Sequence, residues 1–206
     1  MAKVHPDRHP NVLPPSPAEE KEEEATSLTV WRKSLLFNCR GYTVFDGRGD
    51  LAYRVDSYDD AGADAGAVLM DPAGRPAFTV ARRSRLLGLL SGQQRLIYAG
   101  EDTRRPAVYA VVRRRGKATA RVTPCAAAGA AYEVEGSYAR RRCVVYDAER
   151  RVVVAEVRPK EAVVGTDVFR LVVRPGFDVS LAMAVVVALD QLFGGRPSLL
   201  RSWSTM

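Results

Sequence analysis

Histidine is scarce in this sequence, and its scarcity limits the chemistry that the chain can perform. The two histidines, His5 and His9, both lie in a Pro-rich N-terminal segment. Ser-His-Asp and Cys-His catalytic groups, like most zinc sites, need a histidine held inside a folded domain. No Gly-rich loop follows a strand and opens a helix, so Gly47-Arg48-Gly49 is interpreted as a turn and not as a nucleotide-binding loop. We therefore expect a protein without enzymatic activity, metal ion or cofactor.

Carboxylates and thiols are the next residues that could do chemistry. Glu133 and Glu135 are two positions apart, which places both on one face of a strand, where they could act as a pair. A solvated strand face explains them more simply. Cys39, Cys125 and Cys143 are odd in number and lack Cys-x-x-Cys spacing, which favours neither a disulfide framework nor a zinc site. We expect reduced, buried thiols.

Arginine clusters remain as the residues with a recognisable binding chemistry. Most fall at the ends of predicted strands or in predicted turns, and the guanidinium group binds phosphate oxygens in a bidentate manner. If the fold brought roughly four to eight of them together, each would contribute about 1 kcal/mol to binding an anionic membrane surface. The candidate anion- or lipid-binding residues are Arg82, Arg83, Arg85, Arg113, Arg114, Arg115, Lys117, Arg140, Arg141 and Arg142. Further basic pairs are Arg104-Arg105 and Arg150-Arg151.

An apolar run, Leu86-Leu87-Gly88-Leu89-Leu90, directly follows the first cluster. Such a run beside basic residues could insert into a membrane interface. Packing of the leucines on the end of the domain, with the arginines in water, is the alternative that we favour.

Charge is unevenly distributed along the chain. The net charge is +7, although residues 19–24 form an acidic run that makes the N-terminal segment negative. The rest of the chain is therefore more basic than the total suggests. This pattern fits either screening of the basic body by the acidic segment or a basic face that meets an anionic partner, such as a membrane or a nucleic acid. A solvated, Arg-rich surface without a partner is the third interpretation.

Short strands are expected to position these residues. Between the predicted tails, the sequence contains many short segments rich in Val, Tyr and Phe, and turn residues separate these segments at intervals typical of an all-β sandwich or barrel. The predicted strands are residues 28–31, 42–46, 51–57, 67–71, 76–81, 94–99, 107–114, 118–123, 131–137, 142–147, 151–157 and 168–174. Asp46, Asp71 and Asp147 each follow an apolar strand and precede another, so we predict that they form turns. Residues 1–27 combine prolines with the acidic run and are predicted to be disordered. We place the domain at 28–196 and a flexible tail at 197–206.

One segment, residues 178–193, strongly predicts a helix. Asp178 can cap its start, while Gly194 and Gly195 can end it. Between residues 179 and 189 the sole polar side chain is Ser180. A helix that is apolar on every side must be buried on every side, and a closed sheet is an economical enclosure. At about 24 Å this helix is shorter than the roughly 30 Å core of a bilayer. The alternative is one long strand that runs through residues 185–187. The whole segment 178–193, however, is longer than usual strands.

Several segments, taken in order, resemble the LURP-one-related family of plants. They are residues 28–34 (LTVWRKS), 37–46 (FNCRGYTVFD), 136–147 (GSYARRRCVVYD) and 167–178 (DVFRLVVRPGFD), followed by the apolar helix and Leu189-Asp190. The similarity spans about residues 28–196. The resemblance implies a mainly β fold of the Tubby C-terminal type: a closed, twelve-stranded antiparallel barrel around a central hydrophobic C-terminal helix.

The resemblance also sets the expected function. The family is associated with plant defence, and Tubby domains bind phosphoinositides and act as membrane-tethered regulators. We therefore expect a non-enzymatic module that binds phosphoinositides or anionic phospholipid headgroups. The alternative is a protein-interaction scaffold in defence signalling that binds no lipid. Nucleic-acid binding is not expected, because no aromatic stacking platform accompanies the arginines.

The ends of the sequence bear on where the protein works. The N-terminus lacks the apolar segment of a secretory signal. No stretch reaches the roughly 18–20 apolar residues that a transmembrane helix needs. We expect a soluble, cytoplasmic protein, with attachment to the plasma membrane or a nuclear location as alternatives.

Overall fold

Twelve strands and one helix follow one another in the order that the sequence predicts. The computed structural model describes residues 24–33, 40–57, 66–82, 93–127, 129–160 and 165–194. In these ranges the strands are β1 (Thr26–Trp31), β2 (Arg40–Phe45), β3 (Leu51–Ser57), β4 (Ala67–Met70), β5 (Pro76–Arg82), β6 (Gln94–Ala99), β7 (Tyr109–Arg113), β8 (Ala118–Pro124), β9 (Tyr132–Ser137), β10 (Arg142–Asp147), β11 (Val153–Pro159) and β12 (Val168–Val173). The helix is α1 (Val179–Phe193).

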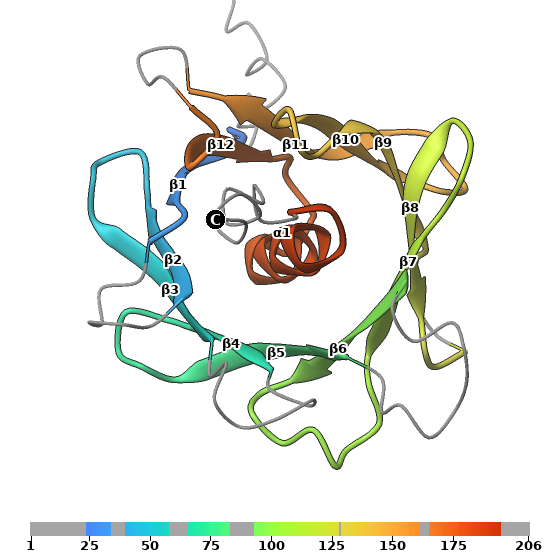
Figure 1. The fold of residues 1–206 in the computed structure, drawn as a ribbon, viewed down its shortest axis with the longest axis horizontal. Helices are drawn as coiled ribbons and strands as arrows, with labels where there is room; N and C mark the ends of the chain where they lie inside the picture. The colour runs from blue at the N-terminus through green and yellow to red at the C-terminus, as the bar shows by residue number, and fades with distance from the viewer. Residues whose placement is uncertain are drawn as a thin grey trace, which may run out of the picture.

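The strands close into a barrel. Each pairs antiparallel with the next along the chain, and β1 pairs with β12 from Thr26–Val173 to Trp31–Val168 (Figure 1). The pairing leaves no open edge in the sheet. The predicted closed, twelve-stranded antiparallel barrel with a C-terminal helix is therefore confirmed. β1 begins at Thr26, two residues before the strand start that the sequence predicts.

Alternation along the strands decides which side chains face the barrel interior. Successive side chains of a strand point to opposite faces of the sheet. One central residue of nearly every strand is inaccessible to solvent, and most of these residues are β-branched. They include Val30, Val44, Val55, Leu69, Val80, Ile97, Val111, Val122, Val134, Val157 and Leu171.

Helix α1 lies inside this ring of strands (Figure 1). Every residue from Leu181 to Leu189 is buried, which is the outcome expected for a helix that is apolar on all sides. The Asp178 carboxylate caps the first turn by accepting hydrogen bonds from the backbone N–H groups of Ser180 and Leu181, at 2.7 and 3.2 Å. The helix ends at Gly194, as the sequence predicts.

The three predicted turn aspartates all form turns. The Asp46 carboxylate accepts backbone N–H bonds from Arg48 and Asp50 at 2.8 and 2.9 Å. Asp71 makes the equivalent bond with Arg75, and Asp147 with Glu149 and Arg150. These backbone N–H bonds come first among the interactions that lower the pKa of each carboxyl.

The barrel has two ends that differ in their connections. The end where α1 begins carries the connections β2–β3, β4–β5, β6–β7, β8–β9 and β10–β11. We call it the helix-entry end. The other end, where α1 finishes, carries the connections β1–β2, β3–β4, β5–β6, β7–β8, β9–β10 and β11–β12. We call it the helix-exit end.

Some sequence predictions fall outside the described residues. They concern most of the N-terminal segment that is predicted to be disordered, the predicted C-terminal tail, His5, His9, Cys39, Arg83, Arg85 and the run Leu86–Leu90. Of the other two cysteines, Cys143 is buried as expected, and burial raises the pKa of its thiol to about 12. The prediction of a buried thiol is wrong for Cys125. This residue is exposed because it follows the end of β8 in the connection to β9.

Candidate functional site

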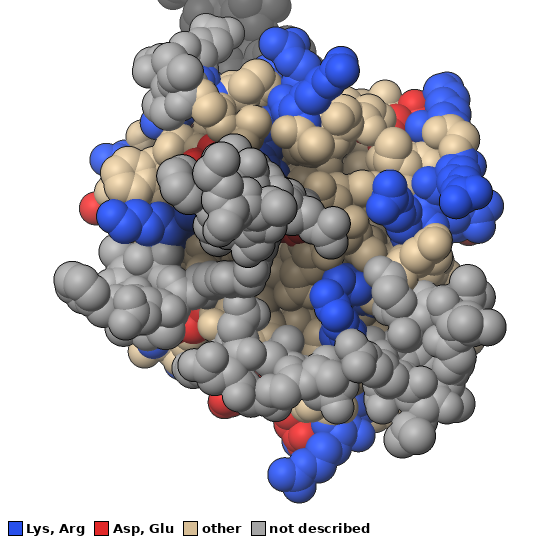
Figure 2. Space-filling model, viewed as in Figure 1, with Lys and Arg blue, Asp and Glu red and all other residues tan. Residues whose placement is uncertain are grey.

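Three of the predicted arginine clusters meet at the helix-exit end. Arg82 ends β5, residues 113–117 join β7 to β8, and residues 140–142 join β9 to β10. Figure 2 looks onto this end and shows Lys and Arg side chains around a central hollow, with a dense group on the side of β7 and β8. The exposed members, which we call the basic rim, are Arg82, Arg113, Arg114, Arg115, Lys117, Arg140 and Arg142.

Among the residues that the structure describes, the charges of the basic rim are largely uncompensated. Within the described residues, Lys117 is the rim member with a carboxylate nearby, because its Nζ lies 3.7 Å from Glu135 Oε2. The Arg113 guanidinium lies 5.0 Å from the centre of the Phe193 ring, in the last turn of α1. Clustered exposed cations sum their fields and so attract an anionic surface.

The helix-entry end has a mixed charge. Its basic residues Arg104, Arg105 and Arg150 lie beside acidic ones, and Arg105 Nε is 3.7 Å from Asp102 Oδ2. The two other predicted basic pairs thus lie away from the rim. This end also holds an open cleft of about 710 Å³ whose lining includes Asp147, Glu149, Arg150, Arg174 and Phe177.

Arg141 differs from its neighbours in the sequence because it is buried. Its side chain is 3% exposed, and its guanidinium lies between the rings of Tyr138 and Phe169, at 4.3 and 4.4 Å from their centres. Arg141 Nε donates to the Thr166 carbonyl oxygen at 2.8 Å. Its φ of +54° places this turn residue in the left-handed region. The structure therefore separates Arg141 from the exposed candidate residues.

Asp190, in the last turns of α1, gathers a polar cluster beneath the rim. Its carboxylate lies 3.4 Å from Arg141 Nη2 and 3.3 Å from Arg32 Nε. Burial raises the pKa of Tyr42 and of Tyr138 well above the ordinary value, and the negative charge of Asp190 adds to both shifts. Burial alone would lower the pKa of Arg32, but Asp190 raises it overall. We call Arg32, Tyr42, Tyr138, Arg141 and Asp190 the Asp190 cluster.

A second buried arginine holds the end of the helix. Arg95 is 2% exposed, and it donates from Nε to the Gln191 side-chain oxygen at 2.8 Å and from Nη2 to the Gln191 carbonyl at 2.9 Å. Burial, with the charge of Arg82, lowers the pKa of Arg95 to about 10, so it stays charged at neutral pH. A cation at a helix C-terminus offsets the partial negative charge of the last carbonyls.

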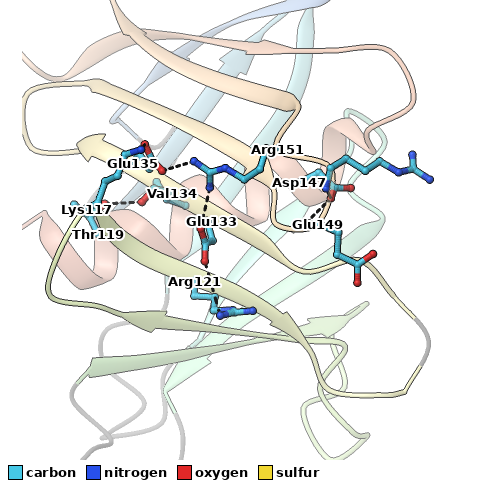
Figure 3. A network of polar contacts seen from close by, with 10 residues as sticks. Lys117, Thr119, Arg121, Glu133, Val134, Glu135, Asp147, Glu149 and Arg151 are labelled. Carbon is cyan, nitrogen blue, oxygen red and sulfur yellow. Dashed lines mark hydrogen bonds and ion pairs between the residues drawn. The ribbon is translucent and has the colours of Figure 1, made fainter.

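The carboxylates of Glu133 and Glu135 have partners on the outer wall of the barrel. Arg151 donates to Glu133 at 3.0 Å and to Glu135 at 2.7 Å (Figure 3). Arg121 lies 3.8 Å from Glu133. The two side chains share a strand face as predicted, but they form an ion-pair network with arginines and not a carboxylate pair.

This network makes a testable prediction about acid sensitivity. The hydrogen bond from Arg151 is the main reason that the pKa of Glu135 is lowered from its usual 4.5. Above pH 4.5, the pKa of Glu135 in the unfolded chain, the network contributes its full stabilisation to the fold. This stabilisation is lost as the pH falls through the lower pKa of Glu135 in the folded protein. Urea denaturation at a series of pH values should show that wild type loses more stability than Glu135→Gln between about pH 5 and 3. Parallel pH profiles for the two proteins would contradict the assignment.

Comparison with known proteins identifies the family. The model of the LURP-one-related family matches residues 26–190, which include every strand and most of the helix. The chain belongs to the LURP-one-related family.

The chain is similar to Arabidopsis thaliana proteins of this family over most of its length. It is 38% identical to LURP-one-related 8 over 94% of this chain and 98% of that protein. It is 35% identical to LURP-one-related 12 over 85% of this chain and 81% of that protein. A solved structure of an Arabidopsis thaliana protein has the same fold, with a TM-score of 0.61 and 24% identity over 82% of this chain and 91% of that one. Within the described part of this LURP-one-related chain, no helix combines the length and the apolar character needed to cross a bilayer.

Proposed function

We propose that this LURP-one-related protein is a non-enzymatic module that binds anionic membrane surfaces, phosphoinositides included, through its basic rim. The observation that carries the proposal is convergence: connections far apart in the sequence bring exposed arginines to one end of the barrel. The helix-entry end, where basic and acidic residues alternate, offers no comparable surface. The membrane would thus meet the end at which α1 finishes.

The protein would be cytoplasmic and would associate with the inner face of a membrane, in keeping with the regulatory role in defence that the family resemblance implies.

Vesicle flotation tests the proposal directly. The variant Arg114→Glu/Arg115→Glu/Arg140→Glu removes three exposed rim cations without touching the buried clusters. At about 1 kcal/mol for each basic residue near the surface, we expect binding to vesicles that contain phosphatidylserine to weaken on the order of 100-fold or more. Raising the salt concentration should weaken wild-type binding in the same direction.

A matched variant separates position from net charge. Arg104→Glu/Arg105→Glu/Arg150→Glu changes the charge by the same amount at the helix-entry end. We expect it to float nearly as well as wild type. If wild type stays in the soluble fraction at low salt, or if both variants lose binding equally, the rim is not a membrane-docking surface. A protein that instead co-purifies and withstands moderate salt would favour the scaffold function.

A further inference from the structure

The Asp190 cluster contains more donors than its acceptors can satisfy. Arg32 and Arg141 are two cations around the single carboxylate of Asp190. Arg141 Nη1 and the Tyr138 hydroxyl are buried, and neither has a hydrogen-bond partner among the described residues. A buried polar atom without a partner costs about 1–3 kcal/mol, so native proteins rarely keep two such atoms in one place without a reason.

The unsatisfied groups belong to side chains that are fixed in place. Tyr138 and Arg141 are each 3% exposed, and the Arg141 guanidinium is held by Thr166 and by two aromatic rings. Because burial raises the pKa of both Tyr42 and Tyr138, both phenols keep their protons at neutral pH. The buried part of the cluster is therefore a pre-organised set of donors in which two cations face one buried carboxylate, while the exposed Asp167 contacts Arg32 from the solvent side.

Arg32 lies on the solvent side of the cluster. Its side chain is 29% exposed, and its contacts with Asp190 and Asp167 are 3.3 and 3.8 Å long. Charge-assisted N–H···O bonds are usually about 2.7–2.9 Å, so these longer contacts leave Arg32 able to exchange one carboxylate for another anion. Such an exchange would open the buried donors to a ligand.

We infer that the Asp190 cluster binds a phosphate monoester, with Arg32, Arg141 and the Tyr138 hydroxyl as donors. A phosphate monoester fits because its three terminal oxygens can accept from the unpartnered buried donors, and its negative charge is attracted by the one buried cation in excess of the Asp190 carboxylate. The phosphate can belong to a lipid headgroup or to a free phosphate ester. For a lipid headgroup the inference rests on the proposed function, because the basic rim would bring the membrane to this end of the barrel.

Tyr138→Phe is a sharp test because it removes a buried hydroxyl that has no hydrogen-bond partner among the described residues. The variant should fold with an unchanged or slightly higher melting temperature. Wild type should float more strongly with vesicles containing a phosphatidylinositol phosphate than with vesicles containing phosphatidylserine at equal surface charge. In Tyr138→Phe this preference should fall roughly ten-fold, while binding to phosphatidylserine is retained.

Two further measurements separate the sources of the phosphate and the two proposals. Tyr132→Phe changes a buried tyrosine near the helix-entry end and should keep the wild-type preference. Calorimetry with the water-soluble headgroup, glycerophosphoinositol phosphate, shows whether the site takes a free ester. Binding of the soluble headgroup by wild type but not by Tyr138→Phe supports the site even if no vesicle binds. Equal wild-type binding to the two kinds of vesicle, together with no heat from the soluble headgroup, would overturn the inference and leave the basic rim unaffected.

Discussion

Replacing Gly136 by alanine is expected to destabilise the barrel by about 3 kcal/mol or more, through strain and collision together. Gly136 in β9 has a φ of +95°, which an L-residue rarely adopts. A Cβ atom at this position would lie 2.5 Å from the Arg142 carbonyl oxygen and 3.1 Å from Cys143 Cα, both in the paired strand β10. Neither backbone atom can move without breaking the pairing. Urea denaturation followed by circular dichroism measures the loss.

Gly116→Ala is the matched control for this prediction. Gly116 also has a positive φ, +127°, but a Cβ atom there would meet nothing within 4 Å. Gly116→Ala should therefore lower the free energy of unfolding by about 1 kcal/mol, through the unfavourable backbone conformation alone. If the two variants are equally stable, then the close approach of β9 and β10 at Gly136 is not present in solution.

The strands and the helix could be predicted because their local signals agree with the fold. Asp46, Asp71 and Asp147 carry the side-chain chemistry of a turn, and each forms one. The segment that became α1 has a capping residue, a stop signal and apolar side chains on all faces, so it required enclosure. Closure itself depends on the pairing of β1 with β12, which are separated by most of the chain. No local pattern records that contact; the all-apolar helix called for a closed sheet, and the family resemblance supplied the twelve-stranded barrel.

The arginines show where local reasoning fails. Arg140, Arg141 and Arg142 are consecutive and identical in type, yet Arg141 alone is buried, with its guanidinium against the rings of Tyr138 and Phe169. The sequence contains no signal for this. Arg95 is different: it precedes buried Ile97 by two positions in β6, so strand alternation places it on the inner face. That signal was present and was missed, as was the role of Asp190, which directly follows the apolar stretch of the helix.

This division of the arginines matters for any test of binding. Exposed rim residues can be replaced with little effect on stability, because surface substitutions usually change it by less than about 0.5 kcal/mol. Arg95 and Arg141 instead hold the end of α1 to the barrel wall through Gln191 and Asp190. A variant that removes them would lose membrane binding simply by loosening the fold. The charge-reversal experiment therefore has to be restricted to the exposed set.

Placing a carboxylate in the middle of the helix is expected to prevent folding. Ala184 is fully inaccessible to solvent, and the neighbouring residues of α1 from Leu181 to Leu189 are all buried. In Ala184→Asp the side chain would either ionise without a partner or remain protonated at neutral pH. A shift of the pKa by roughly 3–5 units corresponds to about 4–7 kcal/mol, to which the steric penalty adds. Small domains have a total stability of about 5–15 kcal/mol, so the variant should be largely unfolded at room temperature by circular dichroism.

The same substitution one turn earlier in the helix provides the comparison. Ser180 is half-buried in the first turn of α1, and its hydroxyl lies 3.0 Å from that of Tyr53. Ser180→Asp replaces the hydroxyl by a carboxylate, which can only accept from Tyr53, and puts a negative charge at the helix N-terminus, where it is worth about 0.3–1 kcal/mol. Its stability should stay within about 1 kcal/mol of wild type. If Ala184→Asp is as stable as Ser180→Asp, then α1 does not lie in a dry interior. The barrel would in that case have to close around something other than this helix.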